Sequence, residues 1–281
     1  MPALTPDQKR SLVASRSDWF HSIDVGDGIV TPGTTPTAYL ERMWTVMQLP
    51  EDLRGLRVLD IGTYDGFFAF EAERRGAEVV AIDIHPIDCR CFALAKQLRG
   101  SAVTYQQMSV YDLDQQKLGG TFDLVLCLGV YYHLRHLFLA LDNLWAISRG
   151  ELRFETHVID QKLLLADGTM TTLKDFDRRL ADTPIYRFYR FNELGNDYSN
   201  WFGGNIAAVL ESLSSAGFTP ELLGTWNDRA MFKARRNPAR PREWEKGSYE
   251  GTRFTFNPDG TWTSLWIDPR KTGMPDRGSL K

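Results

Sequence analysis

The stretch "VLDIGTYDGFFAFEAERRG", residues Val58 to Gly76, decides the fold. It predicts an apolar strand over 58–61, then a glycine-containing turn and a helix near 66–75, the order of a strand–turn–helix ligand-binding unit. The turn departs from the dinucleotide fingerprint G-x-G-x-x-G, because Tyr64 stands where that pattern has its second glycine. That glycine lets a backbone approach a pyrophosphate, so the turn predicts a ligand without one.

Strands and helices alternate along the chain after this unit. We expect strands at 78–83, 102–107, 122–128, 151–158 and 218–225, with helices near 87–98, 135–148 and 205–216. Strands such as "FDLVLCLG" are apolar on both faces, as a sheet covered by helices on both sides requires. The pattern predicts an α/β protein with a doubly wound, mostly parallel sheet, a Rossmann-like fold.

Three further pieces are expected around this sheet. Residues 1–50 predict a cover of helices and a small hairpin, and residues 51–235 form the ligand-binding domain. The aromatic, arginine-bearing segment 160–205 is predicted to be an insertion that lies over the ligand edge as a lid. Residues 236–281 are typical of a linker, "RNPARPREWEKG", followed by a hairpin with its turn at 257–260.

Composition bears on the environment and on partners. The net charge of −3 gives no overall attraction to nucleic acid or to an anionic membrane. Cys89, Cys91 and Cys127 have no C-x-x-C spacing and indicate a reducing compartment. The sequence contains no run of about 18 apolar residues, the length that spans a bilayer, and residues 1–14 lack an apolar signal core. We expect a soluble, cytoplasmic protein and leave its oligomeric state open, a homodimer included.

The carboxyl ends of the first two strands predict a cofactor, because ligands bind at that edge of such sheets. Gly62 lets the backbone come close to a ligand, and Asp60 can accept from an ammonium group. Asp83 ends the second strand about 20 residues beyond the turn, where a carboxylate can take both hydroxyls of a ribose. A nucleoside with a charged amino-acid tail and no phosphates fits these facts, and S-adenosylmethionine is such a molecule.

The sequence resembles the class I S-adenosylmethionine-dependent methyltransferases over about residues 40–225. The stretches that carry the resemblance are "VLDIGTYDGFFAFEAERRGAEVVAIDI", "FDLVLCLGVYYHLRHLFLALDNLW", "GELRFETHVID" and "NWFGGNIAAVLESLSSAGF". Within that class the chain is most similar to the group that contains the tRNA wobble-uridine carboxymethyltransferase, together with small-molecule methyltransferases from biosynthetic pathways.

The resemblance implies residues for each part of the cofactor. Those implied for the methionyl and sulfonium side are Asp60, Gly62, Leu128 and Tyr132. Those implied for the ribose and adenine are Asp83, Ile84, Val110 and Tyr111. The predicted cofactor turn also includes Gly66 and Tyr64, and Tyr64 replaces the small residue that is usual in the family.

Candidate catalytic residues follow the fourth strand and end the fifth. Methyl transfer from a sulfonium depends mostly on positioning, and a base is needed only for a hydroxyl or a protonated amine. His133 has an unperturbed pKa of about 6.5, which suits proton removal at neutral pH; the alternative is a capping or packing role. Glu155 and His157 share one strand face with Arg153, and an Arg153–Glu155 ion pair is their structural alternative.

A metal site is not predicted. His133 and His136 are three residues apart and could share a metal ion in principle, but no clear third ligand accompanies them.

The insertion supplies candidates for binding the methyl acceptor. Arginine binds carboxylate or phosphate through a bidentate fork, and aromatic side chains can wall a pocket. The alternative is a lid that packs on its own core. The candidates are Tyr186, Arg187, Tyr189, Arg190, Asn200, Trp201 and Asn205.

These patterns predict an S-adenosylmethionine-dependent methyltransferase that acts on an O, N or C centre of a small molecule in specialised biosynthesis. The first alternative is a tRNA-modifying enzyme, although "VASRSDWFHSIDVGDGIVTPG" resembles a pocket cover more than a phosphate-tracking surface. The second alternative is a cofactor-binding protein without catalytic activity.

Overall fold

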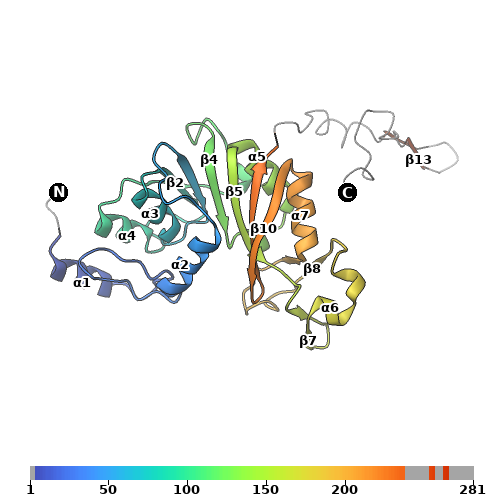
Figure 1. The fold of residues 1–281 in the computed structure, drawn as a ribbon, viewed down its shortest axis with the longest axis horizontal. Helices are drawn as coiled ribbons and strands as arrows, with labels where there is room; N and C mark the ends of the chain where they lie inside the picture. Colours follow the sequence, from blue (N-terminus) through green and yellow to red (C-terminus); the bar gives the residue numbers. More distant parts are fainter. Residues whose placement is uncertain (1–3, 238–252, 257–261, 266–281) are drawn as a thin grey trace. The chain divides into compact units, whose positions relative to one another are not determined.

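The computed structural model describes residues 4–237, 253–256 and 262–265. The chain divides into two compact units, residues 1–236 and residues 237–281. Figure 1 labels the helices and strands. The finer division of the first unit into a cover, a ligand-binding domain and an insertion stays a prediction.

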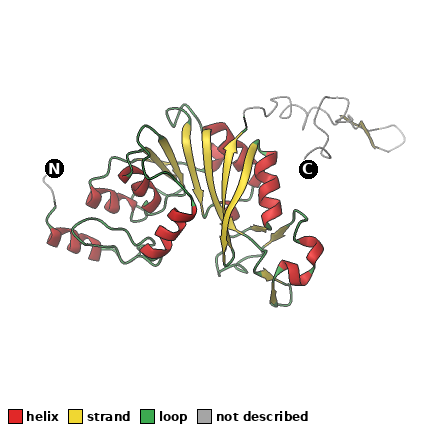
Figure 2. Ribbon diagram, in the orientation of Figure 1, coloured by secondary structure: helices red, strands yellow, loops and turns green. Residues whose placement is uncertain are grey.

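A seven-stranded sheet forms the centre of the first unit (Figure 2). Its strands, in spatial order, are β10 (Phe218–Trp226), β11 (Arg229–Arg236), β5 (Ser148–His157), β4 (Phe122–Leu128), β1 (Arg57–Ile61), β2 (Glu78–Asp83) and β3 (Thr104–Gln107). Strand β11 runs antiparallel to both of its neighbours, β10 and β5, and the other neighbouring pairs of the sheet are parallel. The strand order reverses at β1 and β4, so the ligand edge of this doubly wound sheet lies where these strands end.

Helices cover both faces of the sheet (Figure 2). The principal ones are α3 (Phe67–Arg74), α4 (Phe92–Arg99), α5 (Leu137–Ile147) and α7 (Ile206–Ser215). Successive residues of β1 enter different hydrophobic clusters: Val58 packs with residues of α3 and α4, and Leu59 with residues of α5 and α7. This double burial explains why the inner strands are apolar on both faces.

The N-terminal segment contains α1 (Pro6–Ala14) and α2 (Thr37–Val46). Thr5 and Gln8 form a capping box at the start of α1. The helix ends at Ala14 because the chain folds back there, and the indole N–H of Trp19 donates to the Val13 carbonyl oxygen over 3.1 Å. A tight loop follows, in which Val25 N–H donates to Ile29 O at 2.9 Å.

The insertion follows β5 and is built from short elements. They are β6 (Leu163–Leu164), β7 (Met170–Thr171), α6 (Leu173–Phe176), a 3₁₀ turn (Arg178–Leu180), β8 (Tyr186–Phe188) and β9 (Phe202–Gly204). Two further 3₁₀ turns, η1 (Val110–Asp112) and η2 (Tyr131–His133), follow β3 and β4. The pairing of β8 with β9 and a bridge from Gly204 to Val158 connect the insertion to the end of β5.

The strand β11 was not predicted from the sequence. Its Ala230, Met231 and Phe232 are fully buried, but they are followed by a basic stretch in which Lys233 and Arg235 flank the buried Ala234. Both basic side chains form ion pairs with Glu151 of β5. These basic residues hide the strand in the sequence, although Glu151 of β5 balances two of their charges in the fold.

In the second unit, β12 (Arg253–Phe256) pairs antiparallel with β13 (Trp262–Leu265), so the predicted hairpin is present. Its turn and most of the predicted linker lie outside the described residues. Among the helices that the structure describes, none is long and apolar enough to cross a membrane.

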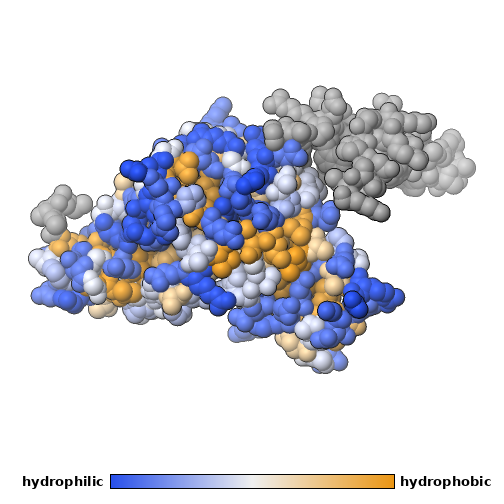
Figure 3. Space-filling model, viewed as in Figure 1, coloured by the Kyte–Doolittle hydropathy of each residue, from blue (hydrophilic) through white to orange (hydrophobic). Residues whose placement is uncertain are grey.

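The surface of the first unit is mainly hydrophilic on the face shown in Figure 3, with hydrophobic areas between the charged regions. The edge strand β10 contributes exposed residues such as Leu222, which is 38% exposed. An edge strand offers unpaired backbone groups to another chain, which keeps the oligomeric state open.

Candidate active site

The turn after β1 requires glycine at position 62. Gly62 has a φ of +68°, and a Cβ atom there would lie 2.6 Å from Cγ2 of Val130. The backbone N–H groups of Gly62 and Thr63 both donate to Ile82 O, which fixes the turn against the end of β2. The turn therefore presents backbone without a side chain at the switch point of the sheet, as the sequence predicts.

Asp60 lies beneath this turn and is almost fully buried. Its carboxylate accepts a hydrogen bond of 2.7 Å from the Thr63 hydroxyl. Burial raises the pKa of Asp60 to about 7, against the opposing effect of the Thr63 hydrogen bond. A cation bound nearby would hold the carboxylate ionised, so Asp60 suits a positively charged ligand group.

Asp83 occupies the end of β2, next to the same turn. Its Oδ2 accepts from Tyr64 N–H at 3.1 Å, and its Oδ1 lies 2.7 Å from Nδ1 of His85. The neighbouring Ile84 is 64% exposed. No motif predicts His85 as a partner of Asp83, and a ribose would share Oδ1 with it.

The predicted adenine residues lie in η1, after β3. Val110 is buried, and the Tyr111 hydroxyl accepts from His136 N–H at 3.1 Å. The backbone oxygens of both residues accept from the side-chain amide of Asn143. These bonds fix η1 to α5, so Tyr111 has a structural task whether or not it meets an adenine.

The N-terminal segment is fastened onto the glycine turn by Asp65, which the sequence analysis missed. Asp65 is fully buried, and its Oδ2 accepts from the backbone N–H groups of Phe20 and His21 at 2.6 and 3.0 Å. Its Oδ1 accepts from Cys91 N–H at 3.3 Å. One carboxylate thereby joins the cover, the turn and the start of α4.

The side chain of Tyr64 in this turn contacts Phe20 and Arg90. Its ring centroid lies 4.7 Å from that of Phe20, and the guanidinium carbon of Arg90 lies 5.0 Å from its ring centroid. The neighbouring His21 is buried, and burial lowers the pKa of its imidazole to about 3. The aromatic side chain at position 64 is therefore a contact for the cover.

A second cluster lies where β4 and β5 end. Glu155 is fully buried and receives two hydrogen bonds from Arg229, including one of 2.7 Å from Nη2 to Oε2. The Arg229 guanidinium carbon lies 4.5 Å from the ring centroid of Tyr132. Arg153 pairs instead with Glu151 over 2.9 Å, so the Arg153–Glu155 ion pair considered from the sequence is wrong. The reason is β11, which brings Arg229 to Glu155.

His157 is buried in a network between β5, the insertion and β11. Its Nε2 lies 2.7 Å from the Tyr189 hydroxyl, and its Nδ1 lies 3.4 Å from Oδ2 of Asp228. The hydrogen bond from His157 lowers the pKa of Asp228 to about 2, and burial raises the pKa of Tyr189 to about 12. Both ring nitrogens of His157 thus have partners within the protein.

His133 ends η2 and meets the insertion. Its Nδ1 lies 2.9 Å from Oγ of Ser199, and burial lowers the pKa of the imidazole. Beside it, Trp201 N–H donates to Tyr132 O at 2.8 Å, and the Arg135 guanidinium carbon lies 4.4 Å from the Trp201 ring. The insertion therefore docks directly on the turn that carries His133.

A family model described as a methyltransferase domain matches residues 37–193. The chain belongs to this methyltransferase family. Its fold, its class of activity and S-adenosylmethionine as its cofactor agree with the predictions made from the sequence.

The names of curated relatives of this methyltransferase state different substrates. It is 31% identical over 175 residues to a tRNA U34 carboxymethyltransferase from Azotobacter vinelandii, across 59% of this chain and 46% of that protein. It is 40% identical over 89 residues to a magnesium-protoporphyrin O-methyltransferase from Rhodobacter capsulatus, across 30% of this chain and 38% of that protein. The chain thus spans half or less of the length of these two relatives.

Solved structures resemble the methyltransferase in fold. The N-terminal domain of EvdMO1 with SAH bound has a TM-score of 0.58 at 18% identity, covering 84% of this chain and 98% of that one. An S-adenosylmethionine dependent methyltransferase from Mesorhizobium loti has a TM-score of 0.51 at 19% identity, covering 69% of this chain and 97% of that one. At such identities the likeness establishes the fold alone.

Several predicted acceptor residues of the methyltransferase are engaged within the insertion. The Tyr186 hydroxyl lies 3.1 Å from that of Tyr131 and 2.8 Å from Oγ of Ser212. Asn205 caps α7 by accepting from Ala208 N–H, and its amide group donates to three carbonyl oxygens of the insertion. Tyr186 and Asn205 therefore hold the insertion in place.

The arginines of the insertion share one carboxylate. Arg187 and Arg190 lie 3.2 and 3.3 Å from Glu193, and Arg187 also donates to Leu164 O. Asn200 is buried, and its Oδ1 has no hydrogen-bond partner within the described part of the chain. Arg190 is the more exposed of the two arginines, so it is the better placed to meet an anionic group.

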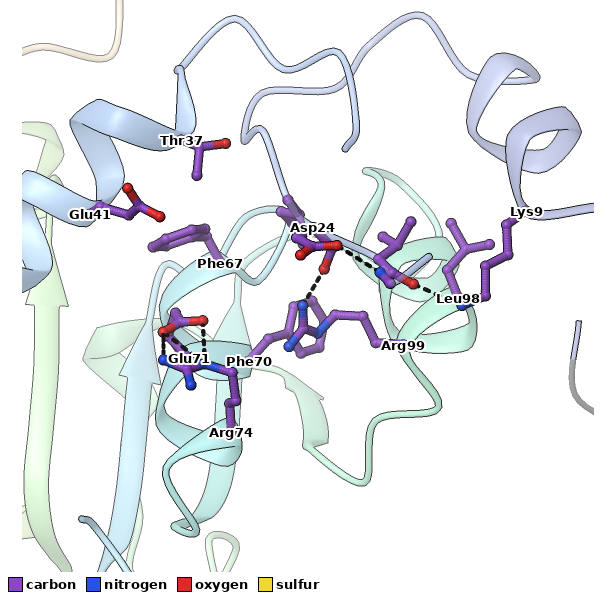
Figure 4. A pocket seen from close by; sticks show the side chains of 13 residues that line it. Lys9, Asp24, Thr37, Glu41, Phe67, Phe70, Glu71, Arg74, Leu98 and Arg99 are labelled. Carbon is purple, nitrogen blue, oxygen red and sulfur yellow. Dashed lines mark hydrogen bonds and ion pairs between the residues drawn. The ribbon is translucent and has the colours of Figure 1, made fainter. Parts of the chain in front are cut away.

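A cavity of about 580 Å³ lies apart from these residues, among α2, α3, α4 and the N-terminal loop (Figure 4). Its lining is charged and aromatic, and includes Glu41, Phe67 and Arg74. None of the site residues predicted from the sequence lines it. Two of its arginines have partners in the lining, since Arg74 bonds to the Glu71 carboxylate and Arg99 donates to the backbone oxygen of Asp24.

Proposed function

We propose that this methyltransferase transfers the methyl group of S-adenosylmethionine to an O, N or C centre of a small molecule, in specialised biosynthesis in the cytoplasm. The observation that carries the proposal is the docking of the insertion on η2. Two hydrogen bonds make this contact, one between Trp201 and Tyr132 and one between Ser199 and His133. This contact places the insertion against the turn that follows β4. A lid at that position would enclose a small acceptor more readily than a polymer.

The residues at the end of β1 and β2 fit the cofactor. When bound, S-adenosylmethionine supplies an electrophilic methyl group on a positively charged sulfur. Gly62, with its φ of +68°, gives the turn a backbone surface without a side chain, and Asp60, whose pKa is raised by burial, gains from a cationic neighbour. Asp83 offers carboxylate oxygens to ribose hydroxyls at the end of β2. The remaining predicted contacts, Gly66, Ile84 and Leu128 among them, keep that role as proposals.

Among the three catalytic candidates, we assign the base to His133. Glu155 is committed to Arg229, and both nitrogens of His157 are committed to Tyr189 and Asp228. His133 is half-buried, with only its Nδ1 held by the insertion within the described residues. It would take the proton that an oxygen or nitrogen acceptor loses on methylation.

The pH dependence of kcat/KM follows from this assignment. Burial lowers the pKa of His133 below its ordinary value of 6.5. The neutral imidazole takes the proton, so activity is expected to be full above that lowered pKa and to fall as the pH drops through it. A pH profile of the wild type and of His133→Gln tests this, and an acid limb that persists unchanged in the variant would contradict the assignment.

Asp83→Ala is expected to weaken the binding of S-adenosylmethionine by about 1–3 kcal/mol, through loss of charged hydrogen bonds to the ribose. Isothermal titration measures the affinity. Asp7→Ala is the matched control, because Asp7 pairs with nearby Arg10 at the surface of α1. Equal affinities of wild type and Asp83→Ala would remove Asp83 from the cofactor site.

A tRNA substrate is the second candidate function, favoured by the similarity to tRNA U34 carboxymethyltransferases. Exposed Arg190 on the insertion could meet a phosphate. Incubation with S-adenosylmethionine labelled in its methyl group, against a panel of small acceptors and against total tRNA, separates the two functions. Label in a small molecule supports our proposal, and label in tRNA alone would overturn it.

A further inference from the structure

Two groups of Ser199, a residue of the insertion, lie next to Nδ1 of His133. The Ser199 hydroxyl oxygen lies 2.9 Å from Nδ1, and the Ser199 carbonyl oxygen lies 3.3 Å from it. The same hydroxyl donates its proton to Oδ1 of Asp197 over 2.6 Å, and Ser199 N–H donates to that oxygen over 2.8 Å. A chain of contacts therefore runs from His133 through Ser199 to the carboxylate of Asp197.

The direction of these hydrogen bonds fixes the tautomer. A carbonyl oxygen can only accept, and an ionised carboxylate can only accept. The single hydroxyl proton of Ser199 goes to Asp197, which leaves its oxygen as an acceptor toward the histidine. Both groups that face Nδ1 are then acceptors, so Nδ1 carries the ring proton and Nε2 has the lone pair.

We infer that Ser199 and Asp197 are positioning residues that hold His133 as the Nδ1–H tautomer and thereby make Nε2 its basic atom. This inference rests on the proposed function, in which His133 accepts the acceptor's proton. Neither Ser199 nor Asp197 needs to touch the cofactor or the acceptor. Their effect passes through the imidazole, as an orienting group acts on a catalytic histidine.

The inference couples the base to the insertion. Ser199 and Asp197 come from the segment that docks on η2, where Trp201 N–H donates to Tyr132 O. His133 is therefore held as the Nδ1–H tautomer only while this segment lies on the turn after β4. Docking the insertion on η2 and setting the tautomer of the base become one structural event.

The charges around His133 set how readily its imidazole takes up a proton. The Asp197 carboxylate favours the imidazolium, whereas burial and the guanidinium of Arg229 disfavour it. Arg229 is itself paired with Glu155. Asp197 therefore stabilises the imidazolium that forms when Nε2 takes a proton, while the free imidazole stays neutral.

The direct test is the tautomer of His133 by nitrogen-15 NMR of the histidine-labelled full chain. The protein has five histidines, and the His133 signal is identified by its loss in His133→Gln. We expect the wild type to show protonated Nδ1 and unprotonated Nε2. Ser199→Ala removes the closer acceptor and leaves Nδ1 with only the longer contact of 3.3 Å to the carbonyl oxygen of residue 199, so we expect a larger share of the Nε2–H form. Ser199→Thr, which keeps the hydroxyl, is expected to restore the wild-type pattern.

The kinetic test uses the same variants on the acceptor that the labelling experiment identifies. Ser199→Ala is expected to lower kcat by about 10-fold or more with little change in KM, because the wrong tautomer presents N–H to the acceptor. Ser199→Thr should recover most of the lost rate. Ser215→Ala, which removes a hydroxyl bonded to Ser212 O in α7, is the matched control and should keep the full rate.

The outcomes separate this inference from the proposed function. A wild-type His133 with protonated Nε2, or a Ser199→Ala protein with the unchanged wild-type pattern, would overturn the inference, whatever reaction the protein catalyses. The proposed base role fails separately, through full turnover in a His133 variant. The NMR result needs no acceptor, so it decides the inference even where the labelling experiment finds none.

Discussion

Replacing His133 with alanine is expected to lower kcat by about 10²-fold or more, with the affinity for S-adenosylmethionine unchanged. The imidazole is placed at the end of η2, where the insertion meets the turn after β4. Its removal takes away the proton acceptor without touching the glycine turn or Asp83. Single-turnover kinetics and isothermal titration measure the two quantities separately.

A neighbouring histidine supplies the control for this prediction. His136 lies three residues along the chain, is exposed, and its ring contacts that of Tyr111 at 5.6 Å. His136→Ala should therefore keep nearly the full rate. Full activity in His133→Ala would pass the role of base to His157 or show that the acceptor needs none.

Replacing Glu155 with alanine is expected to lower the free energy of unfolding by about 3–5 kcal/mol. Glu155 is fully buried, and its loss leaves the guanidinium of Arg229 without its carboxylate partner. Urea unfolding followed by circular dichroism measures the change, provided that the slope against urea concentration is compared as well. The effect is large because a buried charge loses its partner and keeps its desolvation.

Two controls make the interpretation specific. Glu155→Leu combined with Arg229→Met removes both charges, so we expect it to recover most of the lost stability. Asp52→Ala breaks the exposed ion pair with Arg54, where solvent screening leaves little stability to lose. A Glu155→Ala protein as stable as the Asp52→Ala protein would contradict the importance of the buried pair.

The inner strands could be predicted from the sequence because burial on both faces leaves a continuous apolar pattern. The bounds of β2 and β4 agree with the prediction residue for residue. Strand β11 could not be found in the same way, because its basic residues are matched by Glu151 only in the folded sheet. Missing β11 also meant missing Asp228 and Arg229, which complete the surroundings of His157 and Glu155.

The site shows the same division between local and tertiary information. Spacing along a continuous strand–turn–helix–strand segment places Asp60, Gly62 and Asp83 at one edge of the sheet. The hydrogen bonds from Asp65 to the N-terminal segment and from Ser199 to His133 join residues more than 40 positions apart. No periodicity or motif in a single sequence carries such pairings, so the fold was needed to find them.

Titration of the purified chain with S-adenosylmethionine in an isothermal calorimeter tests the central claim most directly. A carboxylated analogue of S-adenosylmethionine and NAD are titrated in parallel. The site described here predicts saturable binding of S-adenosylmethionine, weaker binding of the carboxylated analogue and no binding of NAD, which needs the missing glycine at position 64. Absence of S-adenosylmethionine binding would contradict the assignment of the edge at Gly62 and Asp83 as a cofactor site.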